Sequence, residues 1–123
     1  MIESFRRLLR SFIHAWEGIC ILFVTQRNMR IHLAAAFVAM GVGIWLRISR
    51  NEWLWVFLAI SLVIVAEALN SAIEFVCDRL SPDYDPLIKK AKDTAAGGVL
   101  IAALLAVAIG VGVFGPRLIR LLT

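Results

Sequence analysis

Three long apolar stretches, separated by short polar segments, dominate the pattern of this chain. The stretches without Asp, Glu, Lys or Arg cover residues 31–46, 53–66 and 94–116. The last one alone would form ~35 Å of α-helix, enough to cross the hydrocarbon core of a bilayer. The pattern therefore predicts three membrane-spanning helices. We place them at about residues 29–46, 53–80 and 91–119, with a tight turn at 47–52 and a loop over SPDYDPLIKK (81–90).

The chain before these stretches has a different pattern. Apolar side chains recur every three or four residues over about residues 4–24, and basic and polar side chains occupy the other positions. This periodicity predicts an amphipathic helix. A basic helix with an aromatic, apolar face is suited to the surface of an anionic leaflet. The same face would also suit packing against the protein's own spans, and charged residues interrupt it too often for a cleavable signal peptide.

The composition supports this membrane interpretation. Hydrophobic residues make up 61% of the 123 residues, more than a small soluble domain can bury. We therefore predict an all-α membrane protein whose single domain covers residues 1–123, with no room for a soluble catalytic domain. Cys20 and Cys77 lie in apolar surroundings, so we expect both to be buried thiols.

Basic residues are distributed unequally between the two sides of the predicted membrane domain. The turn at 47–52 and the C-terminal segment carry four of them, Arg47, Arg50, Arg117 and Arg120. The other nine are Arg6, Arg7, Arg10, Arg27, Arg30, Arg79, Lys89, Lys90 and Lys92. Because the richer side normally faces the cytoplasm, we expect the N-terminus and the second loop to be cytoplasmic.

A polar stripe runs along the second predicted span. Glu67, Asn70, Glu74 and Asp78 are spaced so that they share one narrow face of a helix. Ionisable groups within a span are costly and by default indicate a functional site. Glu67 would lie ~8 Å below the cytoplasmic interface, within reach of both a lipid headgroup and a soluble substrate.

A second group of polar residues opens the third predicted span. Lys92 and Asp93 precede small residues (Thr94–Gly98) at a helix N-terminus, a combination suited to phosphate. Together with the stripe it indicates phosphoryl transfer. A carboxylate such as Glu74 would hold Mg²⁺, and Glu67 would accept the proton of an attacking hydroxyl.

Other interpretations of the stripe remain open. A glutamate within a span can simply hydrogen-bond to a neighbouring helix or to a second copy of the chain. An oligomer could also use the stripe to conduct protons or cations. The acidic groups, however, all lie toward one membrane face, and the outer half of the second span contains no ionisable partner.

Two motifs resemble those of the bacterial integral-membrane diacylglycerol kinase and undecaprenol kinase family. They are the E-x-x-N-[ST]-A-I-E-x-x-x-D run at 67–78 and the A-K-D-x-[AG]-[AS] run at 91–96. The resemblance implies a homotrimer with active sites shared between protomers, in the bacterial cytoplasmic membrane with the site on its cytoplasmic side. It also implies ATP with Mg²⁺ as phosphate donor, a lipid alcohol as acceptor, and no nucleic-acid partner.

The resemblance also implies roles for particular residues. Glu67 resembles the general base, Asn70 supports the site, and Glu74 resembles a metal ligand that also organises the nucleotide. The positions that resemble further nucleotide contacts are Lys92, Asp93, Arg7 and His14. Gln26 stands where the family usually has a second metal-binding glutamate, and an amide contributes no charge to Mg²⁺. We therefore expect weaker metal binding, and a catalytically silent relative is a further alternative.

The acceptor is predicted from a smaller set of residues. The R-N-x-x-x-H pattern at 27–32 and the DPLIKKAKD segment resemble the undecaprenol kinase branch. Residues on the acceptor side would be Asn28, Met29, Arg30, Ile31 and His32. This favours undecaprenol over diacylglycerol, although both are long-chain lipids with one primary hydroxyl.

Overall fold

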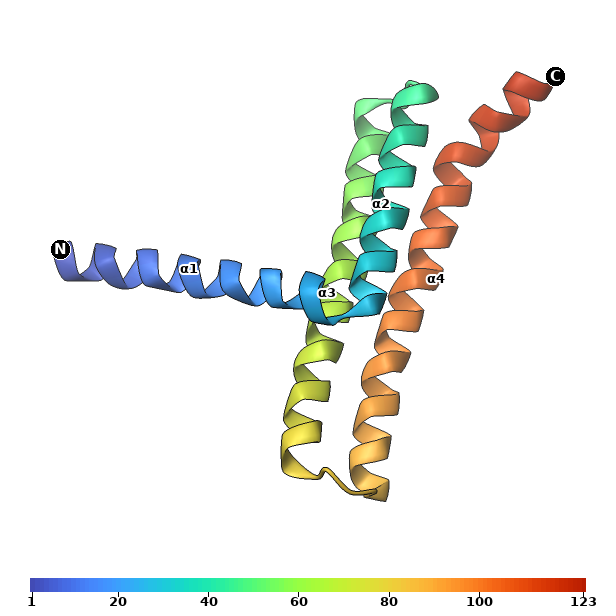
Figure 1. The fold of residues 1–123 in the computed structure, drawn as a ribbon. Coiled ribbons are helices and arrows are strands. Elements are labelled where there is room, and N and C mark those ends of the chain that lie inside the picture. The colour runs from blue at the N-terminus through green and yellow to red at the C-terminus, as the bar shows by residue number, and fades with distance from the viewer.

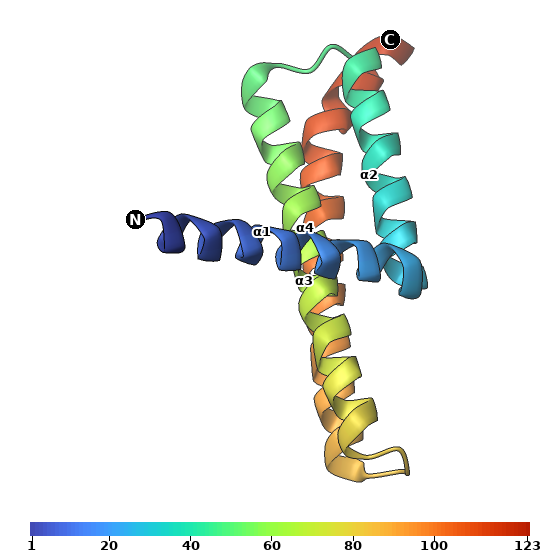
Figure 2. The same ribbon diagram turned by 60° about the vertical axis from the view of Figure 1, so that its left-hand side comes forward.

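A computed structural model describes all 123 residues and contains four α-helices and no strands. The helices are α1 (Ile2–Thr25), α2 (Arg27–Trp45), α3 (Arg50–Leu80) and α4 (Pro86–Leu122). Helices α2, α3 and α4 form a bundle, and α1 extends away from it at a steep angle (Figures 1 and 2). By length and composition each of the four helices could span a membrane. The all-α membrane class predicted from the sequence is confirmed.

The loop between α3 and α4 is shorter than the sequence pattern predicted. Residues 86–90 were expected in the loop but form the first turn of α4. Asp85 caps this helix because its Oδ1 accepts hydrogen bonds from the backbone N–H groups of Leu87 (2.7 Å) and Ile88 (3.2 Å). Pro86 occupies the first helical position, where its missing N–H costs no hydrogen bond. A proline that suggested a loop therefore starts the helix.

The turn between α2 and α3 has well-defined ends on both sides. The N–H groups of Arg47 and Ile48 donate to the carbonyls of Ile44 and Gly43, each at 3.1 Å, which is the Schellman ending of a helix. Arg47 accordingly has a φ of 49°, a conformation that usually favours glycine. Ser49 and Glu52 then form a reciprocal capping box at the start of α3.

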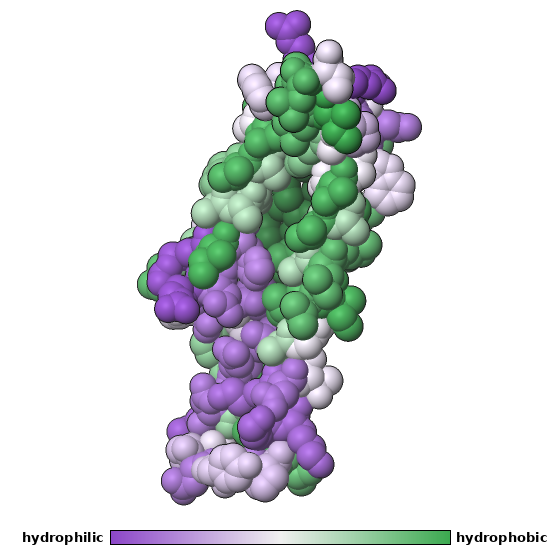
Figure 3. All heavy atoms as spheres, turned by 90° about the vertical axis from the view of Figure 1, so that its right-hand side faces the viewer, coloured by the Kyte–Doolittle hydropathy of each residue, from purple (hydrophilic) through white to green (hydrophobic).

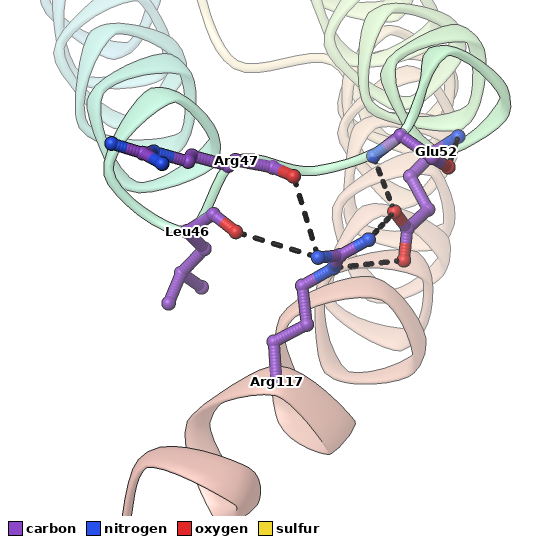
Figure 4. A network of polar contacts seen from close by, with 5 residues as sticks. Leu46, Arg47, Glu52 and Arg117 are labelled. Carbon is purple, nitrogen blue, oxygen red and sulfur yellow. Dashed lines mark hydrogen bonds and ion pairs between the residues drawn. The ribbon is translucent and has the colours of Figure 1, made fainter.

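Polar contacts join the C-terminal part of α4 to this turn (Figure 4). Arg117 forms an ion pair with Glu52, and its Nε donates to Glu52 Oε1 at 3.2 Å. Its Nη1 also donates to the backbone carbonyls of Leu46 (3.4 Å) and Arg47 (3.3 Å). One side chain thus binds the end of α2, the turn and the first turn of α3.

The buried core is small and lies at the same end of the bundle. Ile48, Val56 and Val113 form it, and Trp53 packs against them and stacks on Phe57. Most large apolar side chains are exposed. In Figure 3 they cover much of the upper part of the bundle, whereas hydrophilic residues cover the lower part, around the α3–α4 loop. This distribution is that of a protein whose upper part contacts lipid.

The two cysteines differ in burial. Cys77 is buried on α3, as predicted, but Cys20 is exposed on α1, so the prediction for Cys20 is wrong. The reason is that α1 has no buried residue at all, because it extends away from the bundle.

Candidate active site

Three polar side chains on one face of α3 are almost completely buried. Glu67 is 1% exposed, Asn70 4% and Ser71 0%. Glu67 Oε2, Asn70 Oδ1 and Ser71 Oγ also have no hydrogen-bond partner in the chain. Buried polar atoms are nearly always paired in folded proteins. Three unpaired atoms within two helical turns therefore distinguish this segment as a candidate site for a ligand.

His32 on α2 is the nearest basic group to the buried glutamate. Its Nε2 lies 3.9 Å from Glu67 Oε2, too far for a hydrogen bond but within the range of an ion pair when the imidazole is protonated. His32 lies about one and a half helical turns after the start of α2. The contact therefore places Glu67 near one end of the α2 span and not at its middle.

Burial decreases along the stripe from Glu67 toward the α3–α4 loop. Asn70 is buried, Glu74 is half-buried, and Asp78 is exposed. Asn70 Nδ2 donates to Glu74 Oε1 at 3.3 Å, which fixes one oxygen of this carboxylate and leaves the other free. The stripe thus presents a buried carboxylate at one end and more accessible carboxylates about two and three turns away, at Glu74 and Asp78.

The second polar group meets the lower end of this stripe. Lys92 Nζ on α4 lies 2.8 Å from Asp78 Oδ1 on α3, and Asp93 pairs with Lys89 one turn before it on α4. The structure therefore brings Lys92 and the acidic stripe together. The predicted helix N-terminus at Lys92 is wrong, however, because Asp85 and Pro86 start α4 earlier and Lys92 lies in its second turn. The hydrogen bond and ion pair of Lys92 are with Asp78 and not with Glu67 or Glu74.

An apolar cavity of about 270 Å³ extends from His32 between α2, α3 and α4. Along α3 its lining begins at Val56 and ends at Ile64, one turn before Glu67. Small residues of α2 and α4, among them Ala35, Ala36, Ala39, Ala103 and Ala106, make room for it. A chain-like apolar ligand lying here would have one end close to the buried carboxylate.

The remaining predicted residues form no hydrogen bond or ion pair with Glu67, Asn70 or Glu74. Arg7 and His14 are on the exposed helix α1, where His14 Nδ1 lies 3.2 Å from Glu17 Oε2. Gln26 is the residue between α1 and α2, and its side chain forms no hydrogen bond. Within the predicted acceptor segment Met29 is buried, whereas Asn28 and Ile31 are exposed.

Arg30, the other member of this segment, has a structural contact. Its Nη1 donates to the carbonyl of Val24 at 3.0 Å and approaches that of Phe23 at 3.4 Å. These are among the last carbonyls of α1, which have no partner within the helix. Arg30 therefore holds the end of α1 against the start of α2.

The chain contains no group of three or more His, Cys, Asp or Glu side chains arranged to hold a metal ion. Mg²⁺ seldom needs such a group, because it binds one or two carboxylates together with phosphate oxygens and water. The half-buried Glu74, with one oxygen held by Asn70, fits this mode of binding.

Ser71 is the residue that the sequence analysis did not single out. Its hydroxyl is buried beside Asn70 and lacks a partner. Its spacing could have indicated that it belongs to the site, because Ser71 is four residues after Glu67 and therefore lies on the same helix face.

Comparison with known proteins gives a consistent result. A family model described as prokaryotic diacylglycerol kinase matches residues 13–114. The undecaprenol kinase of Bacillus subtilis is 39% identical over 94% of this chain and 94% of the relative. The diacylglycerol kinase of Synechocystis is 39% identical over 94% of this chain and 66% of the relative. The diacylglycerol kinase of Escherichia coli is 31% identical over 85% of each chain.

Proposed function

Because the chain belongs to the prokaryotic diacylglycerol kinase family and is therefore a membrane lipid kinase that uses ATP, we propose that its acceptor is undecaprenol. The Bacillus subtilis relative, which is similar over nearly the whole of both chains, bears that name. Diacylglycerol is the second candidate acceptor, since the Synechocystis and Escherichia coli relatives are named for it. Both reactions would form a phosphate ester of a primary lipid hydroxyl.

The observation that carries the proposal is the position of Glu67 beside the apolar cavity. The lipid chain would lie in the cavity, and its hydroxyl would emerge past His32 toward Glu67 Oε2, which has no other partner. Glu67 would then accept the hydroxyl proton as the oxygen attacks the terminal phosphorus of ATP, and the bond from that phosphorus to the bridging oxygen would break to release ADP. The low exposure of Glu67 would keep water from taking the place of the lipid.

The nucleotide would bind at the more exposed end of the stripe. Glu74 would hold Mg²⁺ on the phosphates, with Asn70 orienting its carboxylate, and the ion would neutralise charge that develops on the transferred group. Gln26 would contribute at most a neutral oxygen to the ion. Lys92 and Asp93 would contact the nucleotide, and Lys92 would exchange its partner Asp78 for a phosphate.

Arg7 and His14 would complete the nucleotide site only in an assembly. Within one chain both are exposed on helix α1, and neither side chain forms a hydrogen bond or ion pair with α3 or α4. In a homotrimer with shared sites, α1 of one protomer would reach the stripe of another. We propose that α1 lies on the cytoplasmic surface of the bacterial cytoplasmic membrane, with the nucleotide site on the same side. The steep angle between α1 and the bundle supports this placement.

The test is phosphate transfer from radiolabelled ATP by the purified protein in detergent, with undecaprenol and diacylglycerol offered at equal concentrations. We expect label in undecaprenol at several times the rate in diacylglycerol. A reversed preference would replace undecaprenol with diacylglycerol as the acceptor. If neither lipid is labelled, while Gln26→Glu labels one of them, the chain is a weakened kinase whose metal site lacks a charge.

A further inference from the structure

A basic recess lies at the end of the bundle opposite the candidate active site. It has a volume of about 330 Å³ and is lined by Trp45, Leu46, Arg47, Arg117, Arg120 and Leu121. Half of these residues are arginines. The six residues together come from the end of α2, the following turn and the last turns of α4. The kinase reaction proposed above uses none of them.

The three arginines of the recess differ in whether their side chains already have hydrogen-bond partners. Arg117 binds Glu52 and two backbone carbonyls (Figure 4). The guanidinium of Arg47 points away from this network. The side chains of Arg47 and Arg120 form no hydrogen bond or ion pair with any residue of the chain. The lining therefore carries three positive charges, and only that of Arg117 is paired with a carboxylate, so an anion in the recess would offset the excess.

The apolar part of the lining restricts what that anion can be. Trp45 and Leu121 are 66% and 62% exposed, and they lie at the ends of the apolar helices α2 and α4. Tryptophan is typical of the headgroup level of a membrane. A ligand with a phosphate between the two free guanidinium groups and an acyl chain along Leu121 would satisfy both parts of the recess.

We propose that this recess is a binding site for the phosphate of an anionic phospholipid such as phosphatidylglycerol, in the leaflet opposite the active site. Arg47 and Arg120 bind the phosphate oxygens, and Trp45 and Leu121 contact the glycerol and the first methylenes. Lipid binding at this recess does not depend on phosphate transfer, so it can be tested independently of the acceptor proposed above.

The experiment places a photoreactive amino acid at Leu121 and reconstitutes the whole protein in bilayer discs. The discs contain equal amounts of phosphatidylglycerol and phosphatidylcholine, and mass spectrometry counts the adducts of each lipid. Two arginines near the headgroups favour an anionic lipid by about 30-fold. We therefore expect a strong excess of phosphatidylglycerol adducts, which falls toward equality in Arg47→Gln/Arg120→Gln.

Two further variants keep the result interpretable. Arg47→Lys/Arg120→Lys retains both charges and should keep most of the preference for phosphatidylglycerol. This variant separates the loss of charge from a loss of structure caused by replacing the arginines. Arg79→Gln/Lys90→Gln removes two charges at the other end of the bundle and should leave the preference unchanged. Equal numbers of phosphatidylglycerol and phosphatidylcholine adducts in the protein with its arginines intact would overturn the proposal. So would a loss of the phosphatidylglycerol preference in Arg79→Gln/Lys90→Gln as large as that in Arg47→Gln/Arg120→Gln. A preference abolished by inorganic phosphate in the buffer would identify free phosphate as the ligand and overturn the lipid assignment.

Discussion

The packing of Gly43 against Trp53 makes a quantitative prediction about stability. A methyl group at Gly43 would lie 2.8 Å from Trp53 Cη2 and 3.1 Å from Ile48 Cδ1. Contacts between carbon atoms are favourable at about 3.5–4.0 Å, so the ring must move. The indole is rigid and stacks on Phe57 with ring centroids 5.4 Å apart. Overpacking of this kind costs about 1–3 kcal/mol, against about 1 kcal/mol gained when alanine replaces glycine in a helix.

Gly43→Ala is therefore expected to destabilise the folded state by about 1 kcal/mol. Gly41 provides a matched control, because it lies on the same helix and a methyl group there meets no atom within 4 Å. Gly41→Ala should leave stability equal or slightly higher. The assay is the midpoint of thermal unfolding in detergent, followed by far-ultraviolet circular dichroism. Equal midpoints for the two variants would refute the close packing of α2 against Trp53.

Four further predictions concern single contacts. Arg47→Gly should raise the unfolding midpoint, because the left-handed conformation costs arginine about 1 kcal/mol and costs glycine almost nothing. Asp85→Ala should lower the midpoint, because it removes a helix cap that stabilises the fold by about 1 kcal/mol. Asp85→Asn should retain most of this stabilisation, because asparagine also caps helices. Ser71→Ala should not lower the midpoint, since the hydroxyl that it removes is buried and unpaired. Glu74→Gln should weaken the binding of ATP in the presence of Mg²⁺, measured by titration calorimetry, and unchanged affinity would argue against Glu74 as the metal ligand.

The helices and the polar stripe could be predicted from the sequence because both depend on local spacing. Uncharged stretches set the spans, and four polar residues at helical intervals give one face regardless of how the helices pack. The contact between Lys92 and Asp78 could also be predicted, because the short loop brings the end of α3 close to the start of α4.

Features that depend on how distant helices are placed could not be predicted in this way. The apolar cavity needs the relative positions of α2, α3 and α4, and no residue in its lining is unusual by itself. The partners of Arg117 lie about 65 to 71 positions earlier in the chain. The turn at Arg47 lacks the glycine that normally signals a Schellman ending. Pro86 suggested a loop because proline is typical both of turns and of the first position of a helix.

The central claim is that Glu67 acts as the general base beside the lipid cavity, and one comparison tests it most directly. Glu67→Gln keeps the shape of the side chain but removes its capacity to accept a proton. Asp83→Asn is the control, because it neutralises an exposed carboxylate in the α3–α4 loop.

The measurement is the rate of phosphate transfer to undecaprenol and to diacylglycerol, together with the affinity for ATP in the presence of Mg²⁺. We predict that Glu67→Gln lowers the rate by about 10²- to 10⁴-fold while ATP affinity stays within a few-fold of the original. Asp83→Asn should change neither quantity. Transfer by Glu67→Gln at the original rate, or a loss of rate fully explained by a loss of ATP binding, would contradict the account.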